Sequence, residues 1–313
     1  MTTVAPAKKK SWYRTPLVAA VQYPLMRFWT FMMNCFSLET NLATGRMIGR
    51  IWWTISPRHR KLAIQHLRDS FPTEYSDDEI TDIARRSFEH FAQVYLIELA
   101  MTPRALTRSS WPRHIELTDL SDTIRELLQG RSAIMVTPHF GNIELLGFAL
   151  CRMGVPLVAV MRPLDDPRMN AFLVETRAAS GLRLLDKKGM TYEAASVIER
   201  GVPLCFIADQ DAGKKAYFVD FFGRKASTYK SIGLLAVQHD LPVIVGYAAR
   251  IGRGLRYRIE VNRIIRPEDW VDKDNAALWI TEEFSAAMEA GIRKYPEQYL
   301  WVHRRWKSRP KGE

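Results

Sequence analysis

The chain has 313 residues, of which 47% are hydrophobic, and it carries a formal net charge of +11. This composition excludes a collagen, a low-complexity chain and a small disulfide framework, and suits one large α/β domain with a peripheral segment or two small domains. The cysteines, Cys35, Cys151 and Cys205, show no paired or metal-type spacing, which predicts a reducing compartment and no metal site.

The positive charge calls for an acidic partner, such as nucleic acid, an anionic membrane, or an acidic carrier or substrate. Because the charge is dispersed and no nucleic-acid-binding motif appears, we predict no nucleic-acid partner.

The N-terminal part of the chain is first basic and then apolar. Residues 1–10 are polar and lack a signal-peptide cleavage pattern, so we interpret them as a disordered cytoplasmic tail. Residues 16–37 are rich in Phe, Trp and Met, but they are interrupted by a glutamine, a proline and Arg27. An arginine at the centre of a bilayer span costs about 2.5–3.5 kcal/mol, so the segment is expected to lie in the membrane interface. A single pass and a helix packed on the main domain are the alternatives. We therefore assign residues 1–54 to a basic tail and membrane-associated helical segment, and residues 55–313 to the main domain.

Periodicity in the main domain predicts two helices followed by alternating strands and helices. The two helices are expected at 57–72 and 73–100. The strands are expected at 132–137, 156–161, 182–185, 203–208, 242–250 and 255–264, and the helices at 142–153, 167–180, 190–200, 230–239 and 274–294. The chain between the strand ending at 208 and the helix starting at 230 reads as a long polar loop. This alternation predicts an α/β fold with a largely parallel sheet, whose carboxyl-end rim would carry the site.

A short apolar strand is followed by a histidine and then by a carboxylate. Inside one regular helix, five positions of about 100° each would turn His139 and Glu144 well apart. They can face each other only if His139 lies in a turn and Glu144 lies in the first turns of the next helix. Three residues favour this turn. Pro138 disfavours a helix before it, Gly141 allows a tight bend, and Asn142 can cap the next helix. A histidine steered by a carboxylate is typical of a general base, although such a pair can also be purely structural.

Four segments behind different strands then follow in a characteristic order. They are HFGNIE at 139–144, VMRPLDDPRMN at 160–170, IADQDAGKKAYFVDFFGRKAST at 207–228 and LPVIVGYAAR at 241–250. This order resembles the glycerolipid acyltransferase superfamily with its H-x4-D/E motif, and more closely the late lipid A acyltransferase family of lauroyl and myristoyl transferases. The resemblance extends to RHRKLAIQHLRDSFP before these segments and to YPEQYLWVHRRWK after them, and it covers most of residues 55–307.

The resemblance implies a glycerolipid-acyltransferase-like layered sheet covered by helices, with an N-terminal membrane-associated helical segment. It implies an O-acyltransferase in which His139, assisted by Glu144, deprotonates a lipid hydroxyl that attacks the thioester of an acyl carrier protein or CoA. The implied acceptor is a lipid A precursor or related (glyco)lipid, and no cofactor besides this co-substrate is expected. The implied location is an anionic surface on the cytoplasmic face of the bacterial inner membrane, with peripheral, monotopic or single-pass attachment. The alternative is a non-catalytic lipid- or membrane-binding protein that keeps the fold.

Further residues are candidates for binding. Arg162 would bind an acceptor phosphate, pair with a nearby aspartate, or stabilise the oxyanion, for which the backbone N–H groups of the 139–144 turn are the other candidates. The remaining candidates for the acceptor and the acyl chain are Asp209, Gln210, Asp211, Phe222, Gly223 and Thr228. Within this group, Asp211 could instead cap its loop, and Phe222 could instead pack in the core. Arg304, Arg305 and Trp306 would lie at a headgroup interface or form a solvated basic tail.

Overall fold

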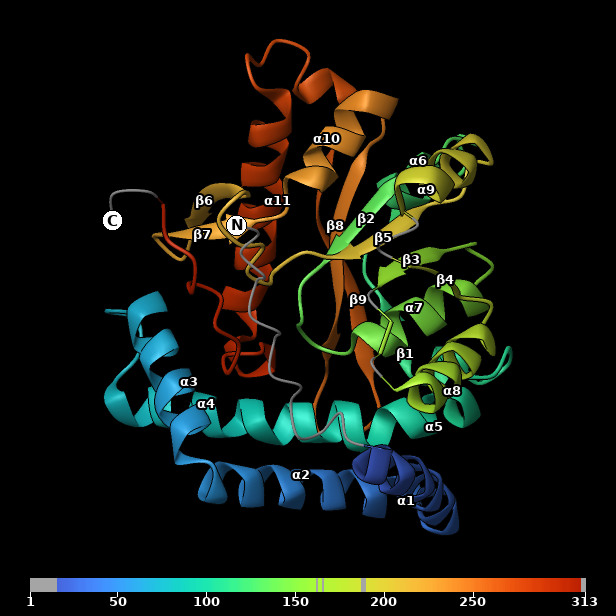
Figure 1. The fold of residues 1–313 in the computed structure, drawn as a ribbon, viewed down its shortest axis with the longest axis vertical. Coiled ribbons are helices and arrows are strands. Elements are labelled where there is room, and N and C mark those ends of the chain that lie inside the picture. The colour runs from blue at the N-terminus through green and yellow to red at the C-terminus, as the bar shows by residue number, and fades with distance from the viewer. Residues whose placement is uncertain (1–15, 162, 165, 187–189, 311–313) are drawn as a thin grey trace, which may run out of the picture.

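A seven-stranded sheet forms the centre of the computed structural model (Figure 1). The structure describes residues 16–161, 163–164, 166–186 and 190–310. The strands of the sheet, in spatial order, are β1 (Ile115–Leu117), β9 (Tyr257–Ile265), β8 (Val243–Arg250), β2 (Ile134–Thr137), β5 (Leu204–Ile207), β3 (Val158–Met161) and β4 (Arg183–Asp186). Neighbouring strands pair in parallel, except for β8 and β9, which are antiparallel. The predicted parallel-rich α/β sheet is therefore confirmed.

Helices cover the sheet. From residue 132 onward the predicted strands and helices lie close to the observed ones, whereas β1 and the helix at 121–127 were not predicted. The covering helices are α3 (Pro57–Ser70), α4 (Asp77–Ala92), α5 (Leu99–Ala105), α6 (Ser121–Leu127), α7 (Ile143–Arg152), α8 (Pro167–Ala178), α9 (Met190–Glu199), α10 (Lys230–His239) and α11 (Ala276–Lys294). A π-helical segment, η2 (Gln93–Glu98), joins α4 to α5, so the predicted helix at 73–100 is continuous but changes its winding. The capping box of Ser76 and Glu79 explains why α4 begins where it does.

The predicted polar loop between residues 208 and 230 is wrong, because half of it forms a hairpin. The hairpin consists of β6 (Tyr217–Phe221) and β7 (Arg224–Thr228), paired antiparallel. Its two-residue turn is Phe222–Gly223, and both residues have positive φ, 53° and 67°. A two-residue turn of this kind matches the twist of a hairpin. Phe221 and Ala226 point into the core, while charged residues on both strands face outward and hide the alternation in the sequence.

Two helices, not one segment, precede the main domain. They are α1 (Pro16–Cys35) and α2 (Leu38–Ile55), and Ser37 caps the second. Trp29 of α1 donates its indole N–H to the carbonyl of Leu96 at 2.6 Å, so α1 packs on the main domain. In the described part of the chain, no helix combines the length and apolarity needed to cross a membrane. The tail predicted at residues 1–10 lies outside the described residues.

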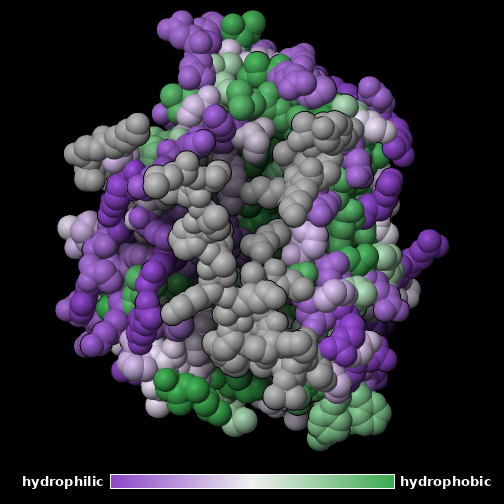
Figure 2. All heavy atoms as spheres, in the orientation of Figure 1, coloured by the Kyte–Doolittle hydropathy of each residue, from purple (hydrophilic) through white to green (hydrophobic). Residues whose placement is uncertain are grey.

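The outer sides of α1 and α2 expose large hydrophobic side chains. We call this surface the apolar face, and it consists of Val21, Leu25, Phe28, Phe31, Met47, Ile51 and Ile55. On α2 these residues are four positions apart, which places them on one side of the helix. Figure 2 shows hydrophobic atoms along the lower edge of the molecule, where α1 and α2 lie in Figure 1. Large apolar side chains exposed together on one side of a protein mark an interaction site.

Candidate active site

The turn between β2 and α7 has the predicted form. The side chain of Asn142 accepts a hydrogen bond from the N–H of Leu145 at 2.8 Å and so caps α7. Gly141 has a φ of +57°, and a Cβ added there would lie 1.9 Å from the carbonyl oxygen of Ala248. Only glycine fits this close approach. As a result, His139 lies in the turn and Glu144 in the first turn of the helix.

The carboxylate that contacts His139 is Asp209. The imidazole Nδ1–H donates to Oδ1 of Asp209 at 2.7 Å, and the Asp209 side chain is only 1% exposed. Asp209 follows β5, which is the parallel neighbour of β2, so both strands deliver their next residues to the same rim. Gln210 then approaches the other ring nitrogen, with 3.3 Å between its Nε2 and Nε2 of His139. Asp209 was expected to bind an acceptor hydroxyl, but its described contact is with the imidazole.

The electrostatics of this pair make the imidazole more basic. Burial alone would lower the pKa of His139, but the charge and hydrogen bond of Asp209, with a smaller contribution from Glu144, raise it above its ordinary value. Burial works against ionisation of Asp209 as well, yet the interaction with His139 lowers the pKa of this carboxyl. With Nδ1–H held by a carboxylate, a neutral imidazole keeps Nε2 unprotonated, as a general base requires, and in the structure this nitrogen accepts a hydrogen bond from the Gln210 amide.

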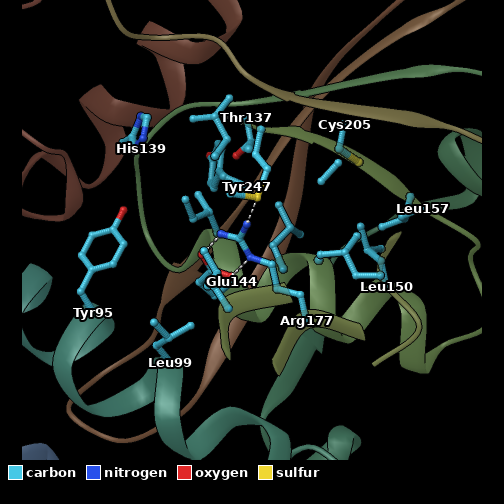
Figure 3. Close-up of a pocket in the computed structure, with 18 of the residues that line it drawn as sticks. Tyr95, Leu99, Thr137, His139, Glu144, Leu150, Leu157, Arg177, Cys205 and Tyr247 are labelled. Atoms are coloured by element: carbon cyan, nitrogen blue, oxygen red, sulfur yellow. Dashed lines mark hydrogen bonds and ion pairs between the residues drawn. The ribbon is translucent and has the colours of Figure 1, made fainter. Parts of the chain in front are cut away.

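Glu144 binds Arg177 instead of orienting the imidazole. The guanidinium of Arg177, on α8, donates hydrogen bonds to both carboxylate oxygens of Glu144, with 2.8 Å between Nε and Oε2 (Figure 3). Arg177 also donates to the sulfur of Met161 at 2.9 Å. The expected contact by which Glu144 would hold the tautomer of His139 is thus absent from the described contacts, and Glu144 acts on the ring only through its charge. No local sequence signal linked Glu144 to an arginine 33 residues further along the chain.

A large apolar cavity begins at His139. Its volume is about 930 Å³, and side chains of β2, β3, β5, α7 and α8 line it together with the inner side of α1. Tyr95 and Leu99 face into it from the helices below, and Leu150 and Leu157 lie at the end away from His139 (Figure 3). The Glu144–Arg177 pair forms a polar section in this wall. Burial raises the pKa of the Tyr95 phenol, which therefore stays protonated.

A buried polar network behind the turn holds it in place, and no sequence pattern predicts it. Glu98, fully buried at the end of η2, accepts hydrogen bonds from Asn142 at 2.7 Å, Tyr257 at 2.6 Å and Arg250 at 2.5 Å. His90 donates from Nε2 to the carbonyl of Gly141 at 2.9 Å. The N–H groups of residues 140, 141 and 142 already donate to other carbonyls, so these three are not free for an oxyanion.

The remaining candidates from the 207–228 segment contact other parts of the fold. Asp211 accepts hydrogen bonds from the N–H and hydroxyl of Ser308, both at 3.1 Å. Phe222 is buried against Phe71 and Trp301, away from the large cavity. Gly223 forms the hairpin turn, and Thr228 is fully buried. Arg162 lies outside the described residues.

The expected headgroup cluster is divided between surface and core. Arg305 is 1% exposed and Trp306 is 6% exposed, so neither side chain presents itself to a membrane surface. The guanidinium of Arg305 donates to the carbonyls of Gln210 and Ser227 and to the hydroxyl of Thr228. These hydrogen bonds fix the loop that carries Asp209. Arg304 is the exposed member of the three. Within the described ranges, no three His, Cys, Asp or Glu side chains come together to hold a metal ion.

Comparison with known proteins matches this chain to one family along most of its length. Residues 8–308 match the family described as bacterial lipid A biosynthesis acyltransferase. The chain is similar to the lipid A biosynthesis palmitoleoyltransferase of Escherichia coli K12, with 26% identity over 86% of this chain and 85% of that protein. It is similar to the lauroyltransferase of the same organism at 26% identity, over 86% and 85% of the two chains. A phosphatidylinositol mannoside acyltransferase of Mycolicibacterium smegmatis is 24% identical over 72% of each chain.

Proposed function

Because the chain belongs to the bacterial lipid A biosynthesis acyltransferase family and is an acyltransferase, we propose that it transfers a fatty acyl group to a hydroxyl of a lipid A precursor or related glycolipid. The proposed donor is the thioester of an acyl carrier protein or of coenzyme A. The observation that carries this proposal is the hydrogen-bonded pair of His139 and Asp209 at the mouth of the 930 Å³ apolar cavity. Such a cavity suits a hydrocarbon chain, and such a pair suits proton removal from a hydroxyl.

In the proposed reaction, Nε2 of His139 takes the proton of the acceptor hydroxyl. The hydroxyl oxygen attacks the thioester carbonyl carbon, and a C–O bond forms as the carbonyl oxygen gains negative charge. When this intermediate collapses, the C–S bond breaks, and the leaving thiolate receives the proton from the imidazolium. Asp209 stabilises the imidazolium between these two steps, because it keeps a negative charge against Nδ1–H. No protein nucleophile is needed.

We place the enzyme at a membrane surface, attached through the apolar face on the cytoplasmic side. The exposed side chains of α1 and α2 support a peripheral attachment, and the inner side of α1 lines the same cavity that would hold the acyl chain. A lipid acceptor at this surface would therefore lie next to the mouth of the cavity. The net charge of +11 favours an anionic lipid surface.

Acyl transfer from labelled donors tests the proposal. Purified protein is offered radiolabelled acyl carrier protein or acyl-CoA with a panel of membrane lipids, and His139→Ala is compared with the wild type. We expect a labelled lipid from the wild type and a loss of at least about a hundredfold in the variant, since general-base catalysis contributes about 10²–10⁴. Equal turnover by a folded His139→Ala variant would refute the role of His139. Binding of anionic vesicles without transfer by either protein would instead favour the non-catalytic alternative.

A further inference from the structure

A tyrosine on the wall of the apolar cavity carries a hydroxyl that makes no bond within the described protein. Tyr95, on η2, lines the 930 Å³ cavity together with His139 and Glu144. Figure 3 shows its hydroxyl pointing from the helix below toward His139. Among the residues that the structure describes, none forms a hydrogen bond with this hydroxyl. The phenol O–H can therefore donate to a molecule bound in the cavity.

Most backbone donors of the turn beside His139 are already used. The N–H groups of residues 140, 141, 142 and 145 donate to oxygens of the protein, and the N–H of His139 donates to Asp209. Within residues 139–145 only the N–H groups of Ile143 and Glu144 are left. Acyl transfer creates a negative charge on the carbonyl oxygen, and hydrogen-bond donors aimed at that oxygen lower the barrier. A side-chain donor at this end of the cavity would thus add to what the turn supplies.

The Tyr95 ring is held in place by the fold. It stacks on Phe91, with 5.7 Å between the ring centroids and 19° between the ring planes. The neighbouring residue Leu96 accepts the indole N–H of Trp29 at 2.6 Å, and Glu98 anchors the end of η2 in the buried network. Tyr95 lies within the π-helical segment, and single π-helical turns inside helices are frequent at functional sites. The donor is therefore oriented before any substrate binds, as stabilisation of a transition state requires.

The position of Tyr95 along the cavity matches that of a thioester carbonyl. Tyr95 and His139 lie at one end of the cavity, and Leu150 and Leu157 lie at the other (Figure 3). An acyl chain that fills the apolar end would bring its carbonyl group to the end with the base.

The surroundings of Tyr95 also fix its protonation state. Burial, together with the charges of Glu144 and Asp209, raises the pKa of the phenol, so it keeps its proton at neutral pH. The influence of both carboxylates places the phenol near the two acidic residues on either side of His139. A neutral O–H at this point acts as a hydrogen-bond donor and not as a second base.

We infer that Tyr95 is a further catalytic residue, whose hydroxyl donates a hydrogen bond to the carbonyl oxygen of the acyl thioester as that oxygen becomes negative. This inference rests on the proposed function. When the acceptor oxygen attacks the carbonyl carbon, the π electrons of the C=O bond move onto the carbonyl oxygen, and the phenol keeps its proton. When the C=O bond forms again, the C–S bond breaks, and the thiolate takes its proton from the imidazolium of His139. Tyr95 thus stabilises the charge without exchanging a proton.

Steady-state kinetics of Tyr95→Phe test this role, because phenylalanine keeps the ring and its stacking and removes only the hydroxyl. We expect kcat to fall by about a hundredfold, with KM for donor and acceptor unchanged, since the contact strengthens only in the transition state. Tyr75→Phe is the matched control. Tyr75 also packs on a phenylalanine four residues earlier, Phe71, with 5.3 Å between the ring centroids, but it does not line the cavity.

Three kinetic results would overturn the inference. An unchanged kcat in Tyr95→Phe would show that the hydroxyl does not act in the reaction. A raised KM with unchanged kcat would show that it only binds the substrate. An equal fall of kcat in Tyr75→Phe would show that the loss has no connection with the cavity.

Binding of two donor analogues tests the contact without turnover. In one, a difluoroketone that hydrates to a tetrahedral centre replaces the thioester; in the other, a thioether lacks the carbonyl oxygen. Tyr95→Phe is expected to weaken binding of the ketone by about tenfold or more and to leave binding of the thioether unchanged. Equal binding of the ketone by both proteins, or equal weakening of both analogues, would refute the contact. If the wild type transfers no acyl group to any lipid, the proposed function fails, while this comparison still decides the role of Tyr95.

Discussion

At the scale of single residues, the site contains two carboxylates with different partners. Asp209 holds the ring of His139, whereas Glu144 is committed to Arg177 in the cavity wall. Glu144 and Arg177 have side-chain exposures of only 10% and 15%, so their charges depend on each other for stabilisation. Removing one member leaves a charge in an apolar cavity without its counterion.

We predict that Glu144→Gln and Arg177→Gln each lower the free energy of unfolding by about 3 kcal/mol, because each leaves its partner uncompensated. The double variant is expected to lose clearly less than the sum of the two, since it removes both charges. Urea unfolding of the four proteins measures this coupling. Strict additivity of the two single effects would show that the pair does not stabilise the cavity wall.

His90 makes stability depend on pH. Complete burial, together with the charge of Arg250, lowers the pKa of His90 to about 3, so the folded protein keeps this ring neutral. The unfolded chain binds a proton below about pH 6.5, so the contribution to stability is complete above that pH and is lost as the pH falls toward 3. This amounts to about 1.4 kcal/mol per pH unit, or roughly 2 kcal/mol between pH 6.5 and 5.

The corresponding prediction compares His90→Gln with the wild type. Glutamine can still donate to the carbonyl of Gly141, but it does not titrate. The variant should therefore lose about 2 kcal/mol less than the wild type when urea unfolding at pH 5 is compared with pH 7. An identical loss in the two proteins would mean that His90 titrates normally in the folded state.

At the scale of elements, the turn before α7 is held by the buried polar network around Glu98. Asn142 both caps α7 and donates to Glu98, so one side chain links the β2–α7 turn to η2. We predict that Asn142→Ala lowers the free energy of unfolding by about 2 kcal/mol. Roughly 1 kcal/mol comes from the lost helix cap, and the rest comes from the hydrogen-bond partner that Glu98 loses. We expect kcat to fall as well.

Asn275 provides the matched control for Asn142→Ala. It caps α11 with the same geometry, its Oδ1 accepting from the N–H of Leu278 at 3.1 Å, but it is exposed and far from the site. Asn275→Ala is expected to cost only the cap, about 1 kcal/mol, with kcat unchanged. If both variants behaved alike in stability and in kcat, the network would have no part in positioning His139.

The elements that the sequence predicts are those with local signals. Pro138, Gly141 and Asn142 specify the β2–α7 turn within five residues, and the structure has it there. The β6–β7 hairpin was missed, because its outward-facing charges resemble a loop. The contact between His139 and Asp209 depends on β2 lying beside β5, which no local pattern encodes. Arg304 and Arg305 are adjacent arginines, and no local pattern indicates that Arg305 is the one buried in the core.

At the scale of the whole molecule, the helices α1 and α2, which carry the apolar face, lie along one side of the molecule, and the central sheet lies above them (Figure 1). Helix α1 belongs to both surfaces: its phenylalanines are exposed, Met26 and Trp29 line the cavity, and Leu25 is exposed and lines the cavity as well. This arrangement places the 930 Å³ apolar cavity close to any surface on which the apolar face rests. Attachment by shallow insertion of these side chains would leave the main domain outside the bilayer.

We predict that Ile51→Glu combined with Ile55→Glu reduces binding to anionic vesicles by at least about tenfold, since each buried aliphatic side chain contributes about 1.5–3 kcal/mol. Both residues are exposed, so the fold should be unaffected, as circular dichroism would verify. Val271→Glu is the control, because Val271 is 82% exposed but belongs to the segment before α11. Vesicle co-sedimentation that is equally weakened by the control would argue against attachment through the apolar face.

The central claim is that His139, made more basic by Asp209, removes the proton from the acceptor hydroxyl. Its most direct test is the pH dependence of kcat/KM for acyl transfer in wild type, Asp209→Asn and the control Asp220→Asn, an exposed aspartate of the hairpin. A base acts when neutral, so the raised pKa of His139 predicts that wild-type activity declines at a pH above 6.5 as the solution is acidified. In Asp209→Asn, burial of the ring is opposed only by the smaller contribution of Glu144, and the account predicts a decline at lower pH with maximal activity reduced by about a hundredfold or more. An unchanged profile and rate in Asp209→Asn would contradict it.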